Sequence, residues 1–315
     1  MKIAFLYAGQ GAQHVGMGRD LYESYPEFRE AFDAGHLDFD LKEICFQDPE
    51  NKISQTQYTQ PAMVAFACGV TKILKNHDIT PQGTCGLSLG EYSALASAGV
   101  FDSATAIDLV AYRGQVMALA AKDVECGMSA VLGLEEETLL ACCKKAASTG
   151  YVTICNYNCP GQLVISGEKA AVEEASALAK EAGAKRVLPL AVSGPFHTKF
   201  MEPAGKALEW KFATTPFHKP AVPVYYNVLG DTATSDVDVA KLLVQQVQSP
   251  VRMERDLRKM LADGYDCFIE IGPGKALSGF LKKVLKDAGI PADTIQIHTV
   301  ETKDDVEALL SAMAA

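Results

Sequence analysis

The sequence predicts an α/β protein with a mainly parallel sheet, and three observations lead to this class. Apolar segments rich in β-branched and aromatic residues alternate along the chain with segments of helical periodicity. Of the 315 residues, 48% are hydrophobic and 22% are charged, so the chain can bury a large core. No internal repeat or low-complexity segment interrupts the alternation. We therefore expect one large domain together with a smaller one.

Periodicity and end signals predict the elements in order. Up to residue 125 we expect a strand at 2–8, a helix from near Met17, a helix from Thr59 and Pro61 to about Lys75, a strand ending before Ser88 and a helix at 103–121 that Asp102 caps. From 126 to 196 we expect strands at 128–134, 151–158, 161–167 and 186–193, and helices at 135–148 and 169–183. Beyond that segment we expect a helix at 198–212, a strand at 222–228, two helices within 237–263, a strand at 265–272, a helix at 274–286 and a strand at 295–300.

The order strand, helix, strand, strand, helix, strand over residues 126–196 differs from the pattern on either side of it. This βαββαβ order is the ferredoxin-like arrangement. We expect a ferredoxin-like subdomain at 126–196, inserted into a core made of 1–125 and 197–315. The strands on both sides of the insert would then complete one mainly parallel sheet.

Charge and cysteine content exclude several classes of protein. The formal net charge is −10, which argues against a general nucleic-acid or membrane-surface binder. The nine cysteines have no metal-type spacing and lie in apolar segments, as reduced core thiols of a cytoplasmic protein do. Basic residues gather only within 252–286, which predicts either a surface for an acidic partner or two solvated helix faces. We expect no metal ion and no bound cofactor.

Residues 86–95 read GLSLGEYSAL and contain the pattern Gly-x-Ser-x-Gly around Ser88. The pattern alone is weak evidence, but a strand is predicted to end just before Ser88 and a helix to begin just after it. In a strand–turn–helix elbow, the flanking glycines leave room for a strained backbone that presents the serine oxygen at a helix N-terminus. We therefore favour a nucleophilic Ser88 over a structural serine.

A nucleophilic serine needs a base and an oxyanion hole. Among six histidines, only His197 stands at a Gly-Pro turn between the two proposed domains, where sites tend to form; a solvated histidine fits the residues equally well. The stretch AGQGAQ (8–13) lacks the third glycine of a dinucleotide fingerprint. Its glycine turn either exposes the N–H of Gln10, as a partner for the N–H of Leu89, or is a plain tight turn.

Arg113 lies beside the apolar stripe of the helix predicted at 103–121. A charge in that place must reach solvent or find an anion. From the residues alone we favour a structural ion pair. The alternative is that Arg113 grips the carboxylate of a substrate with two hydrogen bonds.

Taken together, the motifs resemble those of the malonyl-CoA:acyl carrier protein transacylase family, over essentially the whole chain. The matching segments occur in the family's order and are GQGAQ, GLSLGEYSAL, YRGQVM, NYNCPGQLVISG, GPFH and EIGPGKALSGF. The resemblance implies an α/β-hydrolase-like core with an inserted ferredoxin-like subdomain. It also implies transfer of a malonyl group from malonyl-CoA to the phosphopantetheine thiol of acyl carrier protein, in two steps through a malonyl-serine ester.

The resemblance assigns roles to the candidate residues. Ser88 would be acylated, and His197 would act as general base and then as general acid. The N–H groups of Gln10 and Leu89 would hold the oxyanion. Arg113 would pair with the free carboxylate of the malonyl group, which would select a diacid over acetyl because acetyl leaves the cation unpaired.

Five further residues follow from the same resemblance. The backbone carbonyl of Gln246 would orient the histidine, and Asn156 and Asn158 would line the site. Phe196 gives the ending "-FH" of malonyl-selective acyltransferases, and its ring should exclude an α-methyl group. Leu87 departs from the family pattern, in which a histidine precedes the serine; no catalytic role depends on that histidine in our interpretation.

Three alternatives remain open at this point. A serine esterase or thioesterase would share the elbow but transfer the acyl group to water. A catalytically silent scaffold would bind carrier protein through the basic segment. A discrete acyltransferase would serve polyketide synthesis with the same chemistry and a different carrier protein. We expect a cytoplasmic monomer that meets an acidic carrier protein transiently.

Overall fold

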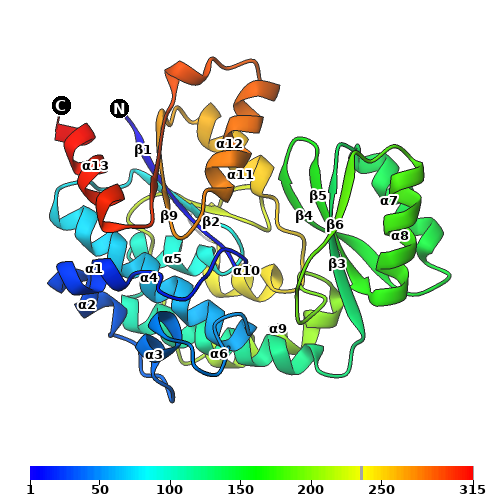
Figure 1. Ribbon diagram of the computed structural model, residues 1–315, viewed down its shortest axis with the longest axis horizontal. Coiled ribbons are helices and arrows are strands. Elements are labelled where there is room, and N and C mark those ends of the chain that lie inside the picture. The colour runs from blue at the N-terminus through cyan, green and yellow to red at the C-terminus, as the bar shows by residue number, and fades with distance from the viewer. Residues whose placement is uncertain (235–236, 315) are drawn as a thin grey trace.

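The structure is a computed structural model that describes residues 1–234 and 237–314. Its larger body is built around a six-stranded sheet, sheet A, with the strand order β10-β9-β1-β2-β7-β8 (Figure 1). The strands are β1 (Ile3–Tyr7), β2 (Gly83–Gly86), β7 (Val224–Tyr226), β8 (Asp231–Thr232), β9 (Cys267–Ile271) and β10 (Gln296–Val300). Every neighbouring pair is parallel except β7 and β8. The predicted α/β class with a mainly parallel sheet is confirmed.

Helices cover both faces of sheet A, and strand β1 shows how the sequence is divided between them. Its residues Ile3, Phe5 and Tyr7 belong to one buried cluster, whereas Ala4 and Leu6 belong to a second, because successive side chains of a strand point to opposite faces. The first cluster includes α4 (Thr56–Asn76), α5 (Gly90–Ser97) and α6 (Ser103–Ala121). The second includes α11 (Met253–Ala262) and α12 (Ala276–Asp287). A strand buried on both faces reads as a continuous apolar run, as KIAFLYA does.

Shorter elements complete the larger body. They are α1 (Arg19–Ser24), α2 (Pro26–Phe32), α3 (Leu41–Phe46), α9 (Glu202–Phe212), α10 (Val239–Gln246), α13 (Lys303–Ala314) and the 3₁₀ turns η1 (Lys199–Met201) and η2 (Ala292–Thr294). No helix in the described part of the chain combines the length and the apolar character that crossing a membrane requires.

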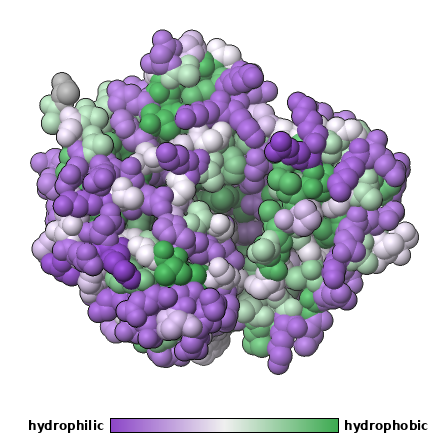
Figure 2. Space-filling view, in the orientation of Figure 1, coloured by the Kyte–Doolittle hydropathy of each residue, from purple (hydrophilic) through white to green (hydrophobic). Residues whose placement is uncertain are grey.

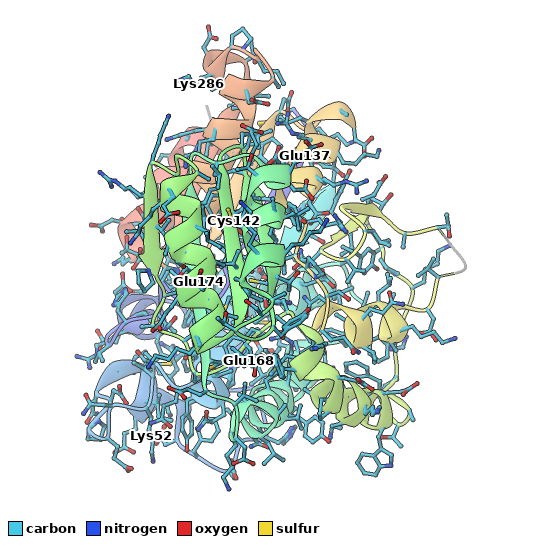
Figure 3. All side chains as sticks on the ribbon, turned by 90° about the vertical axis from the view of Figure 1, so that its right-hand side faces the viewer. Lys52, Glu137, Cys142, Glu168, Glu174 and Lys286 are labelled. Carbon is cyan, nitrogen blue, oxygen red and sulfur yellow. The ribbon has the colours of Figure 1, made fainter. Side chains whose placement is uncertain are left out.

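Residues 126–189 form a separate antiparallel sheet, sheet B, in the order β4-β5-β3-β6. Its elements are β3 (Cys126–Leu132), α7 (Glu136–Ala146), β4 (Val152–Cys159), β5 (Gln162–Glu168), α8 (Lys169–Glu181) and β6 (Arg186–Pro189). Both helices lie on the outer face of the sheet, where Glu137 of α7 and Glu174 of α8 are turned to the viewer in Figure 3, whereas Cys142 of α7 is buried. The opposite face carries Met128 and Val164 toward the larger body.

Several predicted boundaries were wrong, and three helices, α2, α3 and α13, were not predicted. The helix expected near Met17 begins at Arg19, because Gly18 adopts a left-handed φ of 76° just before it. The helix expected from Thr59 begins at Thr56, so that Pro61 lies inside it. The strand expected over 186–193 ends at Pro189, although Leu190 still donates its N–H to the carbonyl oxygen of Met128 at 2.9 Å, and the strand expected over 222–228 contains only Val224–Tyr226. Helices α3 and α13 were missed although both have N-terminal caps: Asp40 accepts from the N–H of Glu43 before α3, and Thr302 and Asp305 cap each other at the start of α13.

Candidate active site

Ser88 lies in the turn between β2 and α5 with a φ of 54°, in the left-handed region that a serine rarely adopts. The flanking glycines permit this turn. A Cβ added at Gly86 would lie 2.0 Å from the backbone of Gly90, and one added at Gly90 would lie 2.4 Å from the carbonyl oxygen of Tyr7. The Gly-x-Ser-x-Gly pattern is therefore a steric requirement of the elbow, as the sequence predicts.

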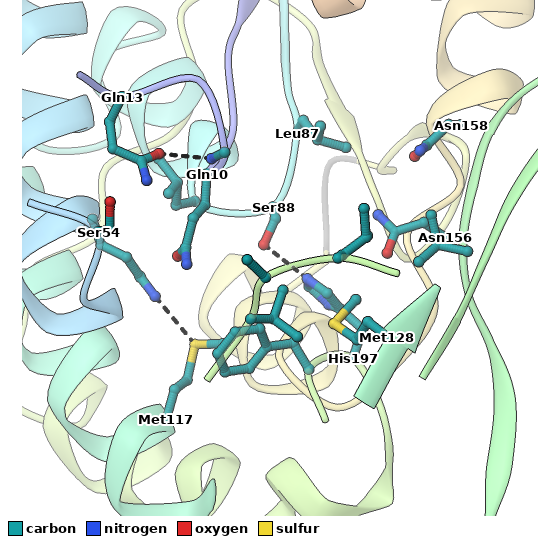
Figure 4. A pocket seen from close by; sticks show the side chains of 18 of the residues that line it. Gln10, Gln13, Ser54, Leu87, Ser88, Met117, Met128, Asn156, Asn158 and His197 are labelled. Carbon is teal, nitrogen blue, oxygen red and sulfur yellow. Dashed lines mark hydrogen bonds between the residues drawn. The ribbon is translucent and has the colours of Figure 1, made fainter. Parts of the chain in front are cut away.

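His197 meets Ser88 across 109 residues of sequence. Its Nε2 lies 2.8 Å from the Ser88 Oγ (Figure 4). Its Nδ1 lies 2.8 Å from the backbone oxygen of Gln246. A carbonyl only accepts, so Nδ1 carries the proton and Nε2 is free to accept one from the serine. Burial, together with the nearby charge of Arg113, lowers the pKa of His197 to about 4. The imidazole is therefore neutral at pH 7, as a general base must be.

Arg113 is 1% exposed and points toward the same serine from α6. Its Nη2 donates to Ser88 Oγ at 3.1 Å and to Gln246 Oε1 at 2.9 Å. Among residues 1–234 and 237–314, no carboxylate forms a salt bridge with it. Burial lowers the pKa of this guanidinium, which still remains charged because an arginine pKa starts so high. The ion pair favoured from the residues alone is not found in the described chain.

Two glutamine side chains join this network, and sequence reasoning missed the role of both. Gln60, on α4, accepts from Arg113 Nη1 at 2.7 Å through its Oε1. The side chain of Gln246 donates from Nε2 to the Ser88 carbonyl oxygen at 2.7 Å, in addition to the carbonyl contact with His197. A buried glutamine beside Pro61 carries no pattern in the sequence that separates it from a surface glutamine, so only the fold could reveal it.

The two predicted oxyanion residues border the same space. Gln10 follows β1, and Leu89 precedes the first residue of α5. Within the described residues, neither backbone N–H has a hydrogen-bond acceptor. Two unpaired N–H groups beside a serine are the donors that an oxyanion requires.

A cavity of about 490 Å³ lies between sheet B and the larger body, and Ser88 and His197 border it. Figure 2 shows the hollow from the side of Figure 1, with apolar residues at its base. All four remaining site candidates line the cavity: Leu87, Asn156, Asn158 and Phe196. Asn156 and Asn158 are two residues apart on β4, and the Oδ1 of Asn158 is buried without a partner among the described residues.

The arrangement contains a serine oxygen, a neutral imidazole held in one tautomer, two free N–H donors and a buried cation. The first three are the parts of an acyl-transfer site, and the cation adds a place for an anionic group. Among residues 1–234 and 237–314, no three His, Cys, Asp or Glu side chains are grouped so as to hold a metal ion.

Comparison with known proteins agrees with this chemistry. The family model of the acyl transferase domain matches residues 4–313. A malonyl CoA-acyl carrier protein transacylase of Bacillus subtilis (strain 168) is 43% identical to this chain. The match includes 96% of this chain and 99% of the Bacillus subtilis protein. The crystal structure of a malonyl CoA-acyl carrier protein transacylase from Clostridium perfringens matches with a TM-score of 0.93 and 39% identity, over 100% of this chain and 98% of that one.

A further solved structure is that of a type II PKS acyl-carrier protein in complex with its malonyl-transacylase. It matches with a TM-score of 0.91 and 36% identity, over 99% of this chain and 100% of that one. These relatives match along nearly their whole lengths. The chain therefore belongs to the acyl transferase domain family and, within it, to the malonyl CoA-acyl carrier protein transacylases.

Proposed function

We propose that this protein transfers the malonyl group from malonyl-CoA to the phosphopantetheine thiol of acyl carrier protein, through a malonyl ester on Ser88. In the first step the Ser88 Oγ attacks the thioester carbonyl while its proton passes to His197 Nε2. The C–S bond breaks, and the CoA sulfur leaves with that proton. In the second step His197 takes a proton from the carrier thiol, whose sulfur attacks the ester; the C–O bond breaks, and His197 returns that proton to the Ser88 Oγ.

Backbone groups supply the remaining hydrogen bonds of this reaction. The N–H groups of Gln10 and Leu89 stabilise the oxyanion of both tetrahedral intermediates. The Gln246 carbonyl stabilises the imidazolium by accepting a hydrogen bond from its Nδ1–H. It occupies the place of the acid in a Ser-His-Asp triad. A carbonyl is uncharged, so it raises the basicity of His197 less than a carboxylate would.

The observation that carries the proposal is the buried Arg113, for which the described residues provide no carboxylate partner. A buried cation whose charge is not compensated costs stability, and the carboxylate of a malonyl group supplies the missing charge next to Ser88. An acetyl group brings no charge and leaves the guanidinium unpaired. An esterase for neutral acyl groups has no use for such a cation.

We further propose that the larger body, 1–125 and 197–315, is an α/β-hydrolase-like core and that 126–196 is an inserted ferredoxin-like subdomain. The helix-covered parallel sheet with a serine elbow after β2 supports the first assignment. The antiparallel order β4-β5-β3-β6 in a βαββαβ chain supports the second. The cavity lies where the two meet, which explains why residues of both line it.

An acidic carrier protein would meet the basic residues of α11, α12 and their flanks. Of the eight basic residues in this stretch, only Arg258 and Lys259 form salt bridges within the described chain. The others remain available for an anionic partner: Arg252, Arg255, Lys275, Lys282, Lys283 and Lys286. We propose a fatty acid carrier protein as that partner, with the polyketide carrier protein of the structural relative as the alternative.

The nine cysteines are free thiols, eight of them buried, which supports a reducing compartment such as the cytoplasm. The chemistry proposed here uses no metal ion and no bound cofactor. We propose that the protein acts as a monomer.

Intact mass spectrometry tests the proposed function. Wild-type protein mixed with malonyl-CoA should gain the mass of one malonyl group, and Ser88→Ala should gain none. Added phosphopantetheinylated carrier protein should then take up that mass and restore the free enzyme. Rapid release of CoA without an adduct or transfer would instead identify a thioesterase. Turnover no faster than that of a Ser88→Ala, His197→Ala double variant would identify a silent scaffold.

A further inference from the structure

Asn227 is a fully buried side chain that contacts the nucleophile elbow on both sides. It directly follows β7, the neighbour of β2 in sheet A. Its Oδ1 accepts the backbone N–H of Ser88 at 2.8 Å, and its Nδ2 donates to the carbonyl oxygen of Gly86 at 2.7 Å. One amide group therefore spans the three residues over which the chain turns from strand to helix.

These contacts act where the backbone is strained. Ser88 has a φ of 54°, and a residue in that region keeps its conformation only when its surroundings hold it there. The N–H of Ser88 is held by Asn227, and its carbonyl is held by Gln246. Both peptide groups that flank the serine are thus fixed by side chains from other elements.

Two buried carboxyl groups hold Asn227 in turn. Glu91 Oε2 accepts the backbone N–H of Asn227 at 2.7 Å, and Asp256 Oδ2 lies 3.3 Å from its Nδ2. Both acids are 0% exposed. Burial raises the pKa of Glu91 to about 8, and burial together with the charge of Glu91 raises the pKa of Asp256 well above its usual value. Glu91 is thus largely protonated at pH 7, and the shift of Asp256 goes in the same direction, toward the uncharged form.

We propose that Asn227 is the positioning residue of the nucleophile, holding the Ser88 elbow in its reactive conformation from both sides while Glu91 and Asp256 fix its own place. The inference rests on the proposed function, through the role of Ser88 as nucleophile. It requires a short side chain that donates and accepts at once. Aspartate has the same shape, but it can donate to the Gly86 carbonyl only while it is protonated.

The substitution Asn227→Asp turns this requirement into a pH dependence. Glu91 on α5 and Asp256 on α11 contact residue 227 directly. The titratable groups that interact with these two acids are Cys85 on β2, Arg113 on α6, Tyr226 on β7 and Asp231 on β8. The two adjacent acids and burial favour the protonated form of Asp at low pH. At high pH its ionisation removes the donor and places a charge under the elbow.

The readout is the rate at which an alkyl fluorophosphonate labels Ser88, because this probe reports the reactivity of the serine without a malonyl group. The Ser88 Oγ forms a bond to phosphorus, fluoride leaves, and His197 takes the serine proton. Ser88→Ala gives the background. Tyr225→Phe is the matched control: it removes a buried hydrogen bond to Asp263 from the same strand, away from the elbow. It should lower the melting temperature and leave the labelling rate unchanged.

We expect the ratio of Asn227→Asp to wild-type labelling rates to be near one at about pH 6 and on the order of 10- to 100-fold lower at about pH 9. Asn227→Ser, whose hydroxyl cannot span both contacts, should label on the order of tenfold or more slowly at both pH values. A ratio that does not change with pH, or Asn227→Ser labelling at the wild-type rate, would overturn the proposal.

The outcome for the wild type separates this inference from the proposed function. Wild-type protein that is not labelled at Ser88 contradicts the nucleophile itself, and both proposals fail together. Wild-type protein that is labelled and malonylated, with Asn227 variants equally reactive, leaves the proposed function intact and contradicts only the role of Asn227. Circular dichroism and the melting temperature of each variant establish that folded proteins are compared.

Discussion

The guanidinium of Arg113 donates to the Ser88 Oγ across 3.1 Å, so the buried cation and the proposed nucleophile share a hydrogen bond before any substrate is present. The serine oxygen is thus held between an acceptor, His197 Nε2 at 2.8 Å, and a charged donor. A substrate carboxylate is a stronger partner for the cation than a hydroxyl oxygen. Its arrival would draw the guanidinium away and leave the serine free to give its proton to the imidazole.

Replacing Arg113 should therefore change selectivity as well as rate. We expect Arg113→Ala to lower kcat/KM for malonyl-CoA by on the order of 100-fold or more, with a much smaller loss for acetyl-CoA. Arg113→Lys should recover part of the loss, because an ammonium keeps the charge but not the planar fork. Acylation rates with the two CoA esters provide the measurement. An equal loss for both esters would show that Arg113 supports the fold and not the choice of substrate.

His197 gives the acylation step an unusual pH profile. An ordinary histidine, with a pKa of 6.5, would lose basicity below that pH, whereas burial and Arg113 lower the pKa of His197 to about 4. The protonated form cannot accept the serine proton, so acylation should fall only as the pH approaches that lower value. We expect a level kcat/KM between about pH 5.5 and 7.5. Arg113→Gln removes a nearby positive charge, so it should move the inflection toward higher pH; an inflection near pH 6.5 in the wild type would contradict the assignment.

Glu91 should make the protein less stable as the pH rises. Its pKa is about 8 in the folded protein, against 4.5 for an ordinary glutamate. Between these values the folded state keeps a proton that the unfolded chain releases, so the free energy of unfolding decreases with pH. Glu91→Gln keeps an acceptor for the Asn227 N–H and removes this loss, worth on the order of a few kcal/mol by about pH 8. Urea unfolding at pH 5 and pH 8 gives the change in the free energy of unfolding with pH for the wild type and for Glu91→Gln. An equal change in the two proteins would show that Glu91 ionises normally. Asp256 should leave a residual slope in the variant.

Site residues could be predicted from the sequence when a local sequence pattern pointed to their chemistry. Ser88 stands between two glycines that the turn requires, and His197 stands at a turn between two regions of different pattern. Arg113 could be identified because a charge beside an apolar stripe must reach solvent or pair with an anion. The partner expected for it, a carboxylate of the protein, was wrong. The residues alone favour a carboxylate partner in an ion pair, and the fold supplies Gln60, Gln246 and the serine instead.

Buried polar groups without a local pattern could not be predicted in the same way. Asn227 directly follows β7 and Asp256 lies in α11, and only the pairing of β7 with β2 brings them beneath Ser88. Alternation of apolar segments predicted the strands and helices, since burial on both faces leaves a continuous apolar run. It could not give the strand order of sheet A, which depends on contacts between segments such as β1 and β9 that are more than 250 residues apart.

Phe196 should restrict branched acyl groups. It is 7% exposed at the cavity wall, and its ring packs against Gly194, where an added Cβ would lie 2.6 Å from the ring. Phe196→Ala should raise the ratio of methylmalonyl to malonyl transfer by on the order of tenfold, because it opens space for one methyl group. Competition between the two CoA esters, followed by mass spectrometry of the acylated enzyme, measures the ratio. An unchanged ratio would place the methyl group elsewhere in the cavity.

Leu87 occupies the one position of the elbow at which this chain leaves the family pattern. Its side chain lines the cavity but also packs against the buried cluster of α11 and α12, so it serves the core as well as the site. No proton transfer involves residue 87, because His197 has the Ser88 oxygen and the Gln246 carbonyl as its partners. We expect Leu87→His to keep kcat/KM for malonyl-CoA within about threefold and to lose about 1 kcal/mol of stability as apolar contact is reduced. Acylation kinetics and urea unfolding of the same preparation separate the two effects, with Leu87→Ala as the control for lost packing alone. A rate increase or loss of tenfold in the histidine variant, absent from the alanine variant, would reveal a polar role for this position that the geometry does not require.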